Sequence, residues 1–528
     1  MQNAKCKGQN AKLKYINSKG DDMTVKILDN EYWWFGQVMM SHNMPFSKDS
    51  EFCGSLTKGS GTDQFAPLAL SSLGRYIHAD AEFDYEIKNG EITLSGRGAD
   101  SAKLYEGFGN LKGAYLAAKD AHFPFCGKTP DLLFLEKPQY NTWIEFNVNQ
   151  TQDEILAYAK SILDSGLPAG VLMIDNGWQE NFGTFEFHAR KIPNPKYMID
   201  ELHKMGFKVM LWVTPIIASA DKLFIKLWKA GYLITEKNGN PCIRHWWDGF
   251  SAVLDFSNPD AVKWYCEQLD SLIERYGVDG FKFDAGDYSF YDDNDVTYGN
   301  VTAREQTKLF NIIGEKYPFN EFRAGWNCGG RAIVARLQDK THSWDKTGLN
   351  MLVPHTIGQG LAGYAYCCPD MLGGGGESSI GRGVKLDDEL FIRWAQANAL
   401  MGMMQISFGF WRYFDKETTQ LILNAVKLHE SVCGYCTELA KEASKTGEPI
   451  VRCLDYEFPG QGYEECTDMF MLGNKYLSAP VLTKGQTERE VRLPEGCKWK
   501  NDKGEIFQGG TVVKEIVPIE RLVYYERI

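Results

Sequence analysis

The chain has 528 residues, of which 44% are hydrophobic and 24% are charged. This length predicts two or three domains, and the composition is that of a globular rather than a disordered protein. The formal net charge of −12 argues against nucleic acid or anionic membrane as a partner, because both require a basic face.

The first residues, MQNAKCKGQNAKLKY, are polar and lack the apolar segment of a signal peptide. No stretch approaches the roughly 18 consecutive apolar residues of a membrane span. The 13 cysteines follow no framework spacing, so we interpret them as reduced thiols and expect a cytoplasmic protein. The lone CxxC at 433–436 has no second pair or histidine cluster nearby, and we predict neither a metal site nor a cofactor.

Residues 1–137 show short alternating runs broken by glycine, such as DYEIKNGEITLSGRG at 84–98. Apolar side chains alternate along this run, and its central Asn-Gly pair is a strong hairpin turn signal. We therefore predict an N-terminal β-sandwich over residues 1–137.

From Pro138 strand-like runs alternate with helical ones, including predicted helices at 151–166, about 197–205 and 259–276. Eight strand candidates follow one another over about 300 residues: TWIEF (142–146), GVLMID (170–175), FKVMLWV (207–213), GFKFD (280–284), EFRAGW (321–326), IVARLQD (333–339), AGYAYCCPD (362–370) and MQISF (404–408). This pattern predicts an α/β fold, a (β/α)8 barrel over residues 138–446. The alternative is a doubly wound open sheet, but the glycine fingerprint of a dinucleotide site is absent after the first strand.

A long helix is predicted from 416 to about 444, and alternating β patterns return after it. The runs GNKYLSAPVL, EVRLPEG and TVVKEIVPIERLVYYERI are separated by turn residues. We predict a C-terminal β-sandwich domain over residues 447–528.

Acidic residues follow the predicted barrel strands. Four strands end in or beside an aspartate: Asp175, Asp284, Asp339 and Asp370. The carboxyl ends of barrel strands share one mouth, where such enzymes place their active sites. A pair of carboxylates there suits glycoside hydrolysis. Metal binding is the rival interpretation, but Lys282 and Arg336 lie beside these acids and oppose a cation.

These segments resemble glycoside hydrolase family 31. GFKFDAGD is similar to the nucleophile motif of that family, which implies that Asp284 is the attacking carboxylate. This chain has Asp287 where many members have glutamate. In RLQDKTHSW, Asp339 lies five residues before a tryptophan, as the acid/base of the family does, although glutamine replaces the glycine of the motif. Asp345 is the competing candidate, and Asp339 is preferred because it ends the predicted strand.

Longer segments carry the same resemblance. ELFIRWAQ (389–396) resembles a helix of the family, and residues 447–482 resemble the start of its small β-domain. The segments PDMLGGG and QISFGFWRY resemble the myogenesis-regulating glycosidase branch, whose activity is α-galactosidase, and the RxH motif of glucosidase members is missing. The resemblance implies a retaining, exo-acting α-glycoside hydrolase, with α-galactosidase favoured. α-Glucosidase, α-xylosidase, sulfoquinovosidase and a catalytically silent sugar-binding protein remain alternatives.

The resemblance also implies roles around the two acids, and a small oligosaccharide or α-glycoside as substrate. Asp175 would accept hydrogen bonds from sugar hydroxyls, and Lys282 and Arg323 would keep Asp284 ionised. Arg336 either contacts substrate or pairs with an acid. The remaining predicted substrate-binding residues are three candidate pocket walls and one strand-end acid beside a glycine loop: Trp178, Trp212, Trp326 and Asp370. Homo-oligomer formation is left open.

Overall fold

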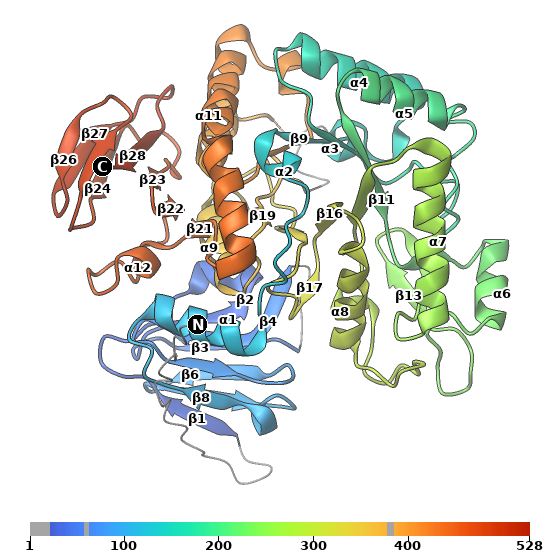
Figure 1. The fold of residues 1–528 in the computed structure, drawn as a ribbon, viewed down its shortest axis with the longest axis horizontal. Helices are drawn as coiled ribbons and strands as arrows, with labels where there is room; N and C mark the ends of the chain where they lie inside the picture. Colours follow the sequence, from blue (N-terminus) through green and yellow to red (C-terminus); the bar gives the residue numbers. More distant parts are fainter. Residues whose placement is uncertain (1–21, 58–62, 377–384) are drawn as a thin grey trace, which may run out of the picture.

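The computed structural model describes residues 22–57, 63–376 and 385–528. In this part of the chain a central α/β barrel is flanked by an N-terminal and a C-terminal β-domain (Figure 1). None of the helices described there is both long and apolar enough to cross a bilayer.

The barrel is a parallel sheet of eight strands, so the predicted fold class is confirmed. In sheet order the strands are β19 (Cys367–Cys368), β18 (Val334–Arg336), β16 (Phe319–Phe322), β15 (Gly280–Phe283), β11 (Lys208–Val213), β10 (Val171–Ile174), β9 (Gln139–Asn141) and β20 (Gln405–Ile406). Because β9 pairs with both β10 and β20, the last strand closes back onto the first, and the sheet is nearly a complete ring.

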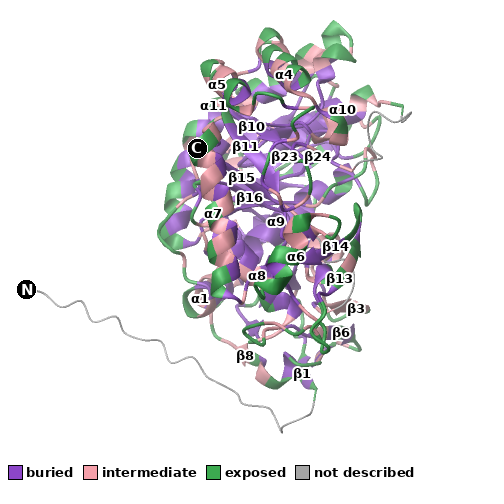
Figure 2. Ribbon diagram, turned by 90° about the vertical axis from the view of Figure 1, so that its right-hand side faces the viewer, coloured by how far each residue is buried: buried purple, intermediate pink, exposed green. Residues whose placement is uncertain are grey.

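Helices surround the sheet, whose strands are buried; most of these helices have an exposed outer face, whereas residues 352–361 and 390–398 are buried on all sides (Figure 2). They are α4 (Gln152–Asp164), α5 (Pro195–Lys204), α7 (Pro259–Tyr276), α8 (Ala303–Gly314), α9 (Leu352–Leu361), α10 (Asp388–Asn398) and α11 (Lys416–Thr446). Helix α7 shows why such segments begin and end where they do. Asn258 caps its first turn, Pro259 fits the first helical position, and Gly277 ends it with a left-handed backbone.

Two of the strands predicted for the barrel differ from the structure. The predicted first strand, TWIEF, is wrong: residues Trp143–Phe146 form the short helix α3. Asn141 Oδ1 accepts a hydrogen bond from the backbone N–H of Trp143 at 2.8 Å, and such a local side-chain bond turns the chain out of the strand. The run EFRAGW splits, because β16 ends at Phe322 and Gly325–Trp326 form strand β17, which pairs with β4 (Gln64–Ser71) outside the barrel.

The N-terminal domain packs two sheets face to face. One contains β1 (Met23–Lys26), β7 (Glu91–Ser95), β6 (Asp84–Lys88) and β3 (Phe52–Ser55), and the other contains β2 (Trp33–Gln37), β4, β5 (Tyr76–His78), β8 (Lys103–Tyr105) and β17. The rings of Phe35 and Tyr85 stack between the sheets with centroids 4.0 Å apart. The predicted hairpin joins β6 to β7, with positive φ at Asn89 and Gly90 as its tight turn requires. Helix α1 (Leu111–His122) follows.

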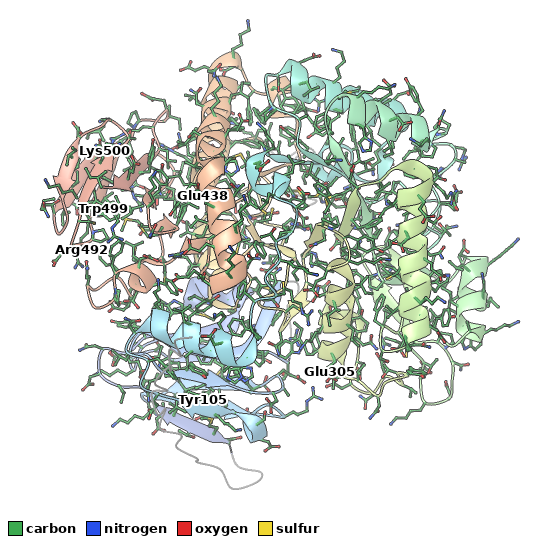
Figure 3. The ribbon with its side chains drawn as sticks, in the orientation of Figure 1. Tyr105, Glu305, Glu438, Arg492, Trp499 and Lys500 are labelled. Atoms are coloured by element: carbon green, nitrogen blue, oxygen red, sulfur yellow. The ribbon has the colours of Figure 1, made fainter. Side chains whose placement is uncertain are left out.

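The C-terminal domain contains a six-stranded sheet and a two-stranded one. The first has β21 (Val451–Arg452), β22 (Phe470–Leu472), β23 (Tyr476–Ala479), β28 (Val523–Arg527), β25 (Lys498–Asn501) and β26 (Ile506–Gln508), and the second has β24 (Glu488–Arg492) and β27 (Val512–Ile516). Trp499 and Lys500, neighbours on β25 that Figure 3 labels, show the alternation of this domain. Trp499 is fully buried, whereas Lys500 forms an ion pair with Glu526.

Candidate active site

A cavity of about 260 Å³ lies at the carboxyl ends of the barrel strands. Its lining contains seven predicted site residues: Asp175, Trp212, Lys282, Asp284, Arg323, Arg336 and Asp339. They lie on or just after β10, β11, β15, β16 and β18. Parallel strands bring these positions together because all their carboxyl ends open at one mouth.

Asp284 follows β15 and is held at both carboxylate oxygens. Arg323 Nε donates to Oδ1 at 2.7 Å, and Trp212 Nε1 donates to Oδ2 at 2.9 Å. Burial raises the pKa of this carboxyl, but the positive charges of Arg323, Lys282 and Arg336 outweigh that effect. The pKa of Asp284 therefore lies below its ordinary range, and the group is ionised at neutral pH.

Arg323 connects Asp284 to a second acid, Asp287. Its two terminal nitrogens donate to the Asp287 carboxylate at 3.2 and 2.9 Å. Burial raises the pKa of Asp287 to about 6, because this effect and the nearby Asp284 charge exceed the opposing effect of Arg323. Asp287 is 1% exposed and is not part of the cavity lining. Its contacts orient Arg323.

Asp339 lies in a different environment. Its side chain is 40% exposed, and its Oδ1 pairs with Arg336 Nη1 at 2.8 Å. Arg336 is 1% exposed, and it also pairs with Asp370 at 3.0 Å and with Glu321 at 3.3 Å. One acid of the pocket is thus enclosed between donors, and the other is open to the cavity.

Asp370 is fully buried behind this pair. Its Oδ2 accepts hydrogen bonds from the backbone N–H groups of Lys340 and Gly375, at 2.6 and 2.9 Å. Burial raises the pKa of Asp370, opposed by the charge of Arg336. A Cβ on Gly375 would lie 2.6 Å from Asp370 Oδ1 and 3.0 Å from Asp339 Oδ1, so only glycine leaves room here.

Asp175 and Lys282 form a buried ion pair on the opposite wall. Lys282 Nζ lies 2.6 Å from Asp175 Oδ2, and both side chains are less than 5% exposed. The backbone N–H of Asn176 donates to Oδ1 at 2.8 Å. A buried charged pair with remaining hydrogen-bonding capacity is a fixed acceptor and donor for the hydroxyls of a small polar ligand.

The structure does not bring every predicted residue to the cavity. Its lining in the described part of the chain includes none of Trp178, Trp326 and the buried Asp370. Trp178 is fully buried and donates to the carbonyl of Trp212 at 2.7 Å. Trp326 belongs to β17, where the guanidinium of Arg304 lies 5.0 Å from its ring centroid. Asp345, the competing acid, is exposed and accepts hydrogen bonds within its own turn from Thr347.

Three residues of the lining were not predicted from the sequence: Trp143, Asn176 and Trp247. Trp143 was assigned to a strand that is instead α3, where its Nε1 donates to the carbonyl of Gly375 at 3.1 Å. Trp247 belongs to the β13 (Ile243–Trp246) to β14 (Gly249–Val253) turn, in a segment inserted between β11 and β15. It is 53% exposed, and its position beside the cavity depends on a turn between two strands that sequence periodicity did not predict.

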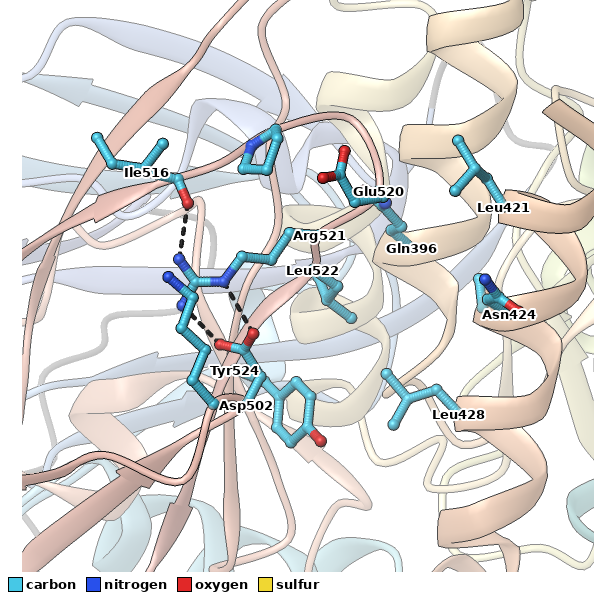
Figure 4. Close-up of a pocket in the computed structure, with 13 residues that line it drawn as sticks. Gln396, Leu421, Asn424, Leu428, Asp502, Ile516, Glu520, Arg521, Leu522 and Tyr524 are labelled. Carbon is cyan, nitrogen blue, oxygen red and sulfur yellow. Dashed lines mark hydrogen bonds and ion pairs between the residues drawn. The ribbon is translucent and has the colours of Figure 1, made fainter. Parts of the chain in front are cut away.

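A larger cavity of about 490 Å³ lies between α11 and the C-terminal domain. Figure 4 shows its most prominent polar group, Arg521, bonded to Asp502 and to the carbonyl of Ile516. A second polar group of the lining, Gln396, donates to the carbonyl of Ile519 at 2.8 Å. Since both groups are already hydrogen-bonded and the described lining contains no acid from the end of a barrel strand, we place the active site in the smaller cavity.

The charges of the site are paired with arginine and lysine. Within the described residues no group of three histidine, cysteine, aspartate or glutamate side chains is arranged to hold a metal ion. Two carboxylates in different environments, one ionised and enclosed and the other accessible, are suited to acid–base and nucleophilic chemistry.

Comparison with known proteins agrees with this geometry. Residues 139–435 match the "Glycosyl hydrolases family 31 TIM-barrel domain", and residues 447–527 match the "Glycosyl hydrolase family 31 C-terminal domain". Among curated proteins, the chain is 33% identical to "Myogenesis-regulating glycosidase" of Mus musculus over 72% of its own length and 55% of that protein. It is 27% identical to "Alpha-xylosidase XylQ" of Lactiplantibacillus pentosus over 70% and 50%.

The chain thus spans about half the length of these curated relatives. Among solved structures, a family 31 α-xylosidase from a soil metagenome, complexed with xylose, superposes with a TM-score of 0.82. That match covers 98% of this chain and 81% of the other at 22% identity, so it shows the fold. The barrel match extends over more than half of the chain, and the chain belongs to glycoside hydrolase family 31.

Proposed function

We propose that this protein is a retaining, exo-acting α-glycoside hydrolase that prefers α-galactosides. Asp284 is the nucleophile and Asp339 the acid/base. The observation that carries the proposal is the contrast between the two carboxylates of one cavity. Asp284 is bonded at both oxygens and has a lowered pKa, whereas Asp339 is 40% exposed and its Oδ1 pairs with Arg336.

These environments fit the two chemical steps of retention. In the first step Asp284 attacks the anomeric carbon, the bond to the leaving oxygen breaks, and Asp339 gives that oxygen its proton. In the second step Asp339 removes a proton from water, and the resulting hydroxide displaces Asp284 from the sugar. Two carboxyls with different environments are the usual means of keeping one ionised and the other able to exchange a proton.

The preference for galactose rests on resemblance to one branch of the family around Asp339 and Asp370, together with the missing RxH motif. Galactose and glucose differ only at the hydroxyl on carbon 4, and each buried group left without a partner costs about 1 to 3 kcal/mol. Two such losses amount to roughly a hundredfold discrimination or more. α-Glucosidase and α-xylosidase activities are the competing assignments within the family.

Sulfoquinovosidase activity fits the site less well. A sulfonate needs a cation whose donors are available, and Arg336 was the candidate. Arg336 is instead engaged by Asp339, Asp370 and Glu321. A bound sulfonate would have to compete with these carboxylates.

The test is a panel of nitrophenyl α-glycosides (galactoside, glucoside, xyloside, sulfoquinovoside and N-acetylgalactosaminide) with the purified protein. We expect kcat/KM to be highest for the galactoside, and a higher value for the glucoside would contradict the sugar assignment alone. Asp284→Asn should abolish turnover while sugar binding persists. Binding without turnover by the wild type would favour the silent sugar-binding alternative.

A further inference from the structure

The N-terminal domain reaches the catalytic strand ends through Asp63, which precedes β4, and Gln64, the first residue of that strand. Both are 1% exposed. The side-chain amide of Gln64 has two N–H groups, and its Nε2 donates to the carbonyls of Arg323 and, at 3.0 Å, of Arg336. These are the two arginines that pair with Asp284 and Asp339.

Gln64 is itself fixed from the barrel side. Its Oε1 accepts a hydrogen bond from Gln359 Nε2 on α9 at 2.6 Å, and the same nitrogen lies 2.9 Å from the carbonyl of Ala335 on β18. The amide of Gln64 therefore has one orientation in which its oxygen and its nitrogen are both used. If the amide were rotated by 180°, its N–H groups would face the Nε2 donor of Gln359. Its oxygen would face the carbonyl oxygens of Arg323 and Arg336.

Asp63 holds the segment that carries the acid/base. Its Oδ1 accepts a hydrogen bond from the backbone N–H of Gln338 at 2.5 Å. Gln338 immediately precedes Asp339. Asp339 extends into the cavity, so the direction of its carboxyl depends on the backbone from Arg336 onward, which Asp63 and Gln64 contact at two points.

The same region departs from the regular barrel pattern. Residues 323–333, all of which are described, connect β16 to β18 without a helix. Instead β17 pairs with β4, with Gly325 opposite Gln64. A Cβ on Gly325 would lie 3.0 Å from Tyr364 Oη and 3.2 Å from Gln64 Cγ. The N-terminal sheet thus takes the place of the missing helix just after Arg323.

We propose that Asp63 and Gln64 are positioning residues for the catalytic carboxylates, acting through the backbone of Gln338 and of the two arginines. This inference rests on the glycosidase function proposed above. Asp63 acts on the acid/base side, whereas Gln64 acts on both sides. Loss of the Asp63 acceptor should therefore impair protonation of the leaving group more than attack on the anomeric carbon.

The experiment compares two substrates of the sugar that the wild type prefers, a dinitrophenyl α-glycoside and the corresponding methyl α-glycoside. The first needs little protonation and the second needs much. In Asp63→Ala we expect kcat for the methyl glycoside to fall about 10- to 100-fold more than for the dinitrophenyl glycoside, with KM little changed. The ratio of the two rates in one sample does not depend on the folded fraction.

A conservative variant of Asp63 and a matched control variant separate the positioning role from a general loss of stability. Asp63→Asn keeps an oxygen acceptor for Gln338 and should restore the wild-type ratio. Tyr364→Phe removes a buried hydroxyl that donates to the carbonyl of Phe65 on the same strand and accepts from the backbone N–H of Cys328. It leaves the hydrogen bonds of Asp63 and Gln64 in place and should leave the ratio unchanged. If Asp63→Ala does not fold, Asp63→Glu, which displaces the acceptor by one methylene, should change the ratio in the same direction.

Gln64→Leu should lower turnover of both substrates, because it releases both arginine carbonyls. An unchanged ratio in a folded Asp63→Ala or Asp63→Glu variant, or the same change in Tyr364→Phe, would overturn the positioning role while leaving the glycosidase assignment intact. A wild type that turns over no α-glycoside would overturn both.

Discussion

Replacement of Arg323 tests how the candidate nucleophile is kept ionised. Arg323 is the only arginine bonded directly to Asp284 in the described structure, and it also holds Asp287 through two further hydrogen bonds. Arg323→Met keeps the length of the side chain but removes its charge and its donors. One hydrogen bond to a charged group contributes about 1.5 to 3 kcal/mol. Since about 1.4 kcal/mol corresponds to one pKa unit, the pKa of Asp284 should rise by roughly one to two units.

The assay is the pH dependence of kcat/KM for an activated aryl glycoside, whose acidic limb reports ionisation of the nucleophile in the free enzyme. The folded pKa of Asp284 is lowered, so its ionisation is retained above that value and lost as the pH falls through it. The limb should move to higher pH in Arg323→Met. Arg331→Met, which breaks an ion pair with Glu315 outside the cavity, is the matched control and should leave the limb in place.

The same replacement leaves Asp287 buried without its cation, and breaking a buried pair in this way costs about 3 to 5 kcal/mol of folding stability. The double variant Arg323→Met/Asp287→Asn removes that unpaired charge. It should be more stable than Arg323→Met and still show the shifted limb. An acidic limb that does not move in either variant would refute the assignment of Arg323 as the group that lowers the pKa of Asp284.

Further predictions concern the acid/base, its glycine neighbour and a buried acid far from the site. Asp339→Asn should slow substrates with poor leaving groups most and permit capture of the glycosyl-enzyme by azide; the same pattern in Asp345→Asn instead would reverse the assignment. Gly375→Ala should lower kcat at least tenfold, because its Cβ meets the oxygens of Asp339 and Asp370; unchanged kinetics would contradict this. Asp455 is 1% exposed, and burial raises its pKa to about 7. Its contribution to stability is therefore present below pH 4 and lost by about pH 7, a change of about 4 kcal/mol that denaturant unfolding should detect in the wild type and not in Asp455→Asn.

The barrel strands were predictable because they are short apolar runs between turn signals, and acids at their ends were visible in the sequence. β15 ends at Phe283, one residue before Asp284, as expected. The first strand was misplaced because TWIEF has strand-forming residues, while the hydrogen bond from Trp143 to Asn141 that turns the chain is invisible to periodicity. The sequence predicted that Trp178 forms a wall of the substrate pocket. In the structure its indole N–H donates to the carbonyl of Trp212 instead.

Contacts between distant segments could not be predicted from the sequence, for a different reason. Asp63 lies 275 positions before Gln338, and no local pattern connects them. The strand pairing of β17 with β4 was likewise hidden, because Gly325 and Trp326 continue a run that reads as one barrel strand. Sequence patterns report the face that a residue presents, and they do not report which distant backbone group it meets.

The balance of charge in the cavity is consistent with the neutral sugar that we propose as substrate. Lys282, Arg323 and Arg336 are each bonded to at least one carboxylate. An anionic ligand would have to displace one of these carboxylates, and the displaced group would remain buried at a cost of several kcal/mol. Hydroxyl groups carry no charge, and they both donate and accept, so a sugar can bind between these pairs without breaking them. We therefore expect the same pairing that lowers the pKa of Asp284 also to disfavour anionic ligands.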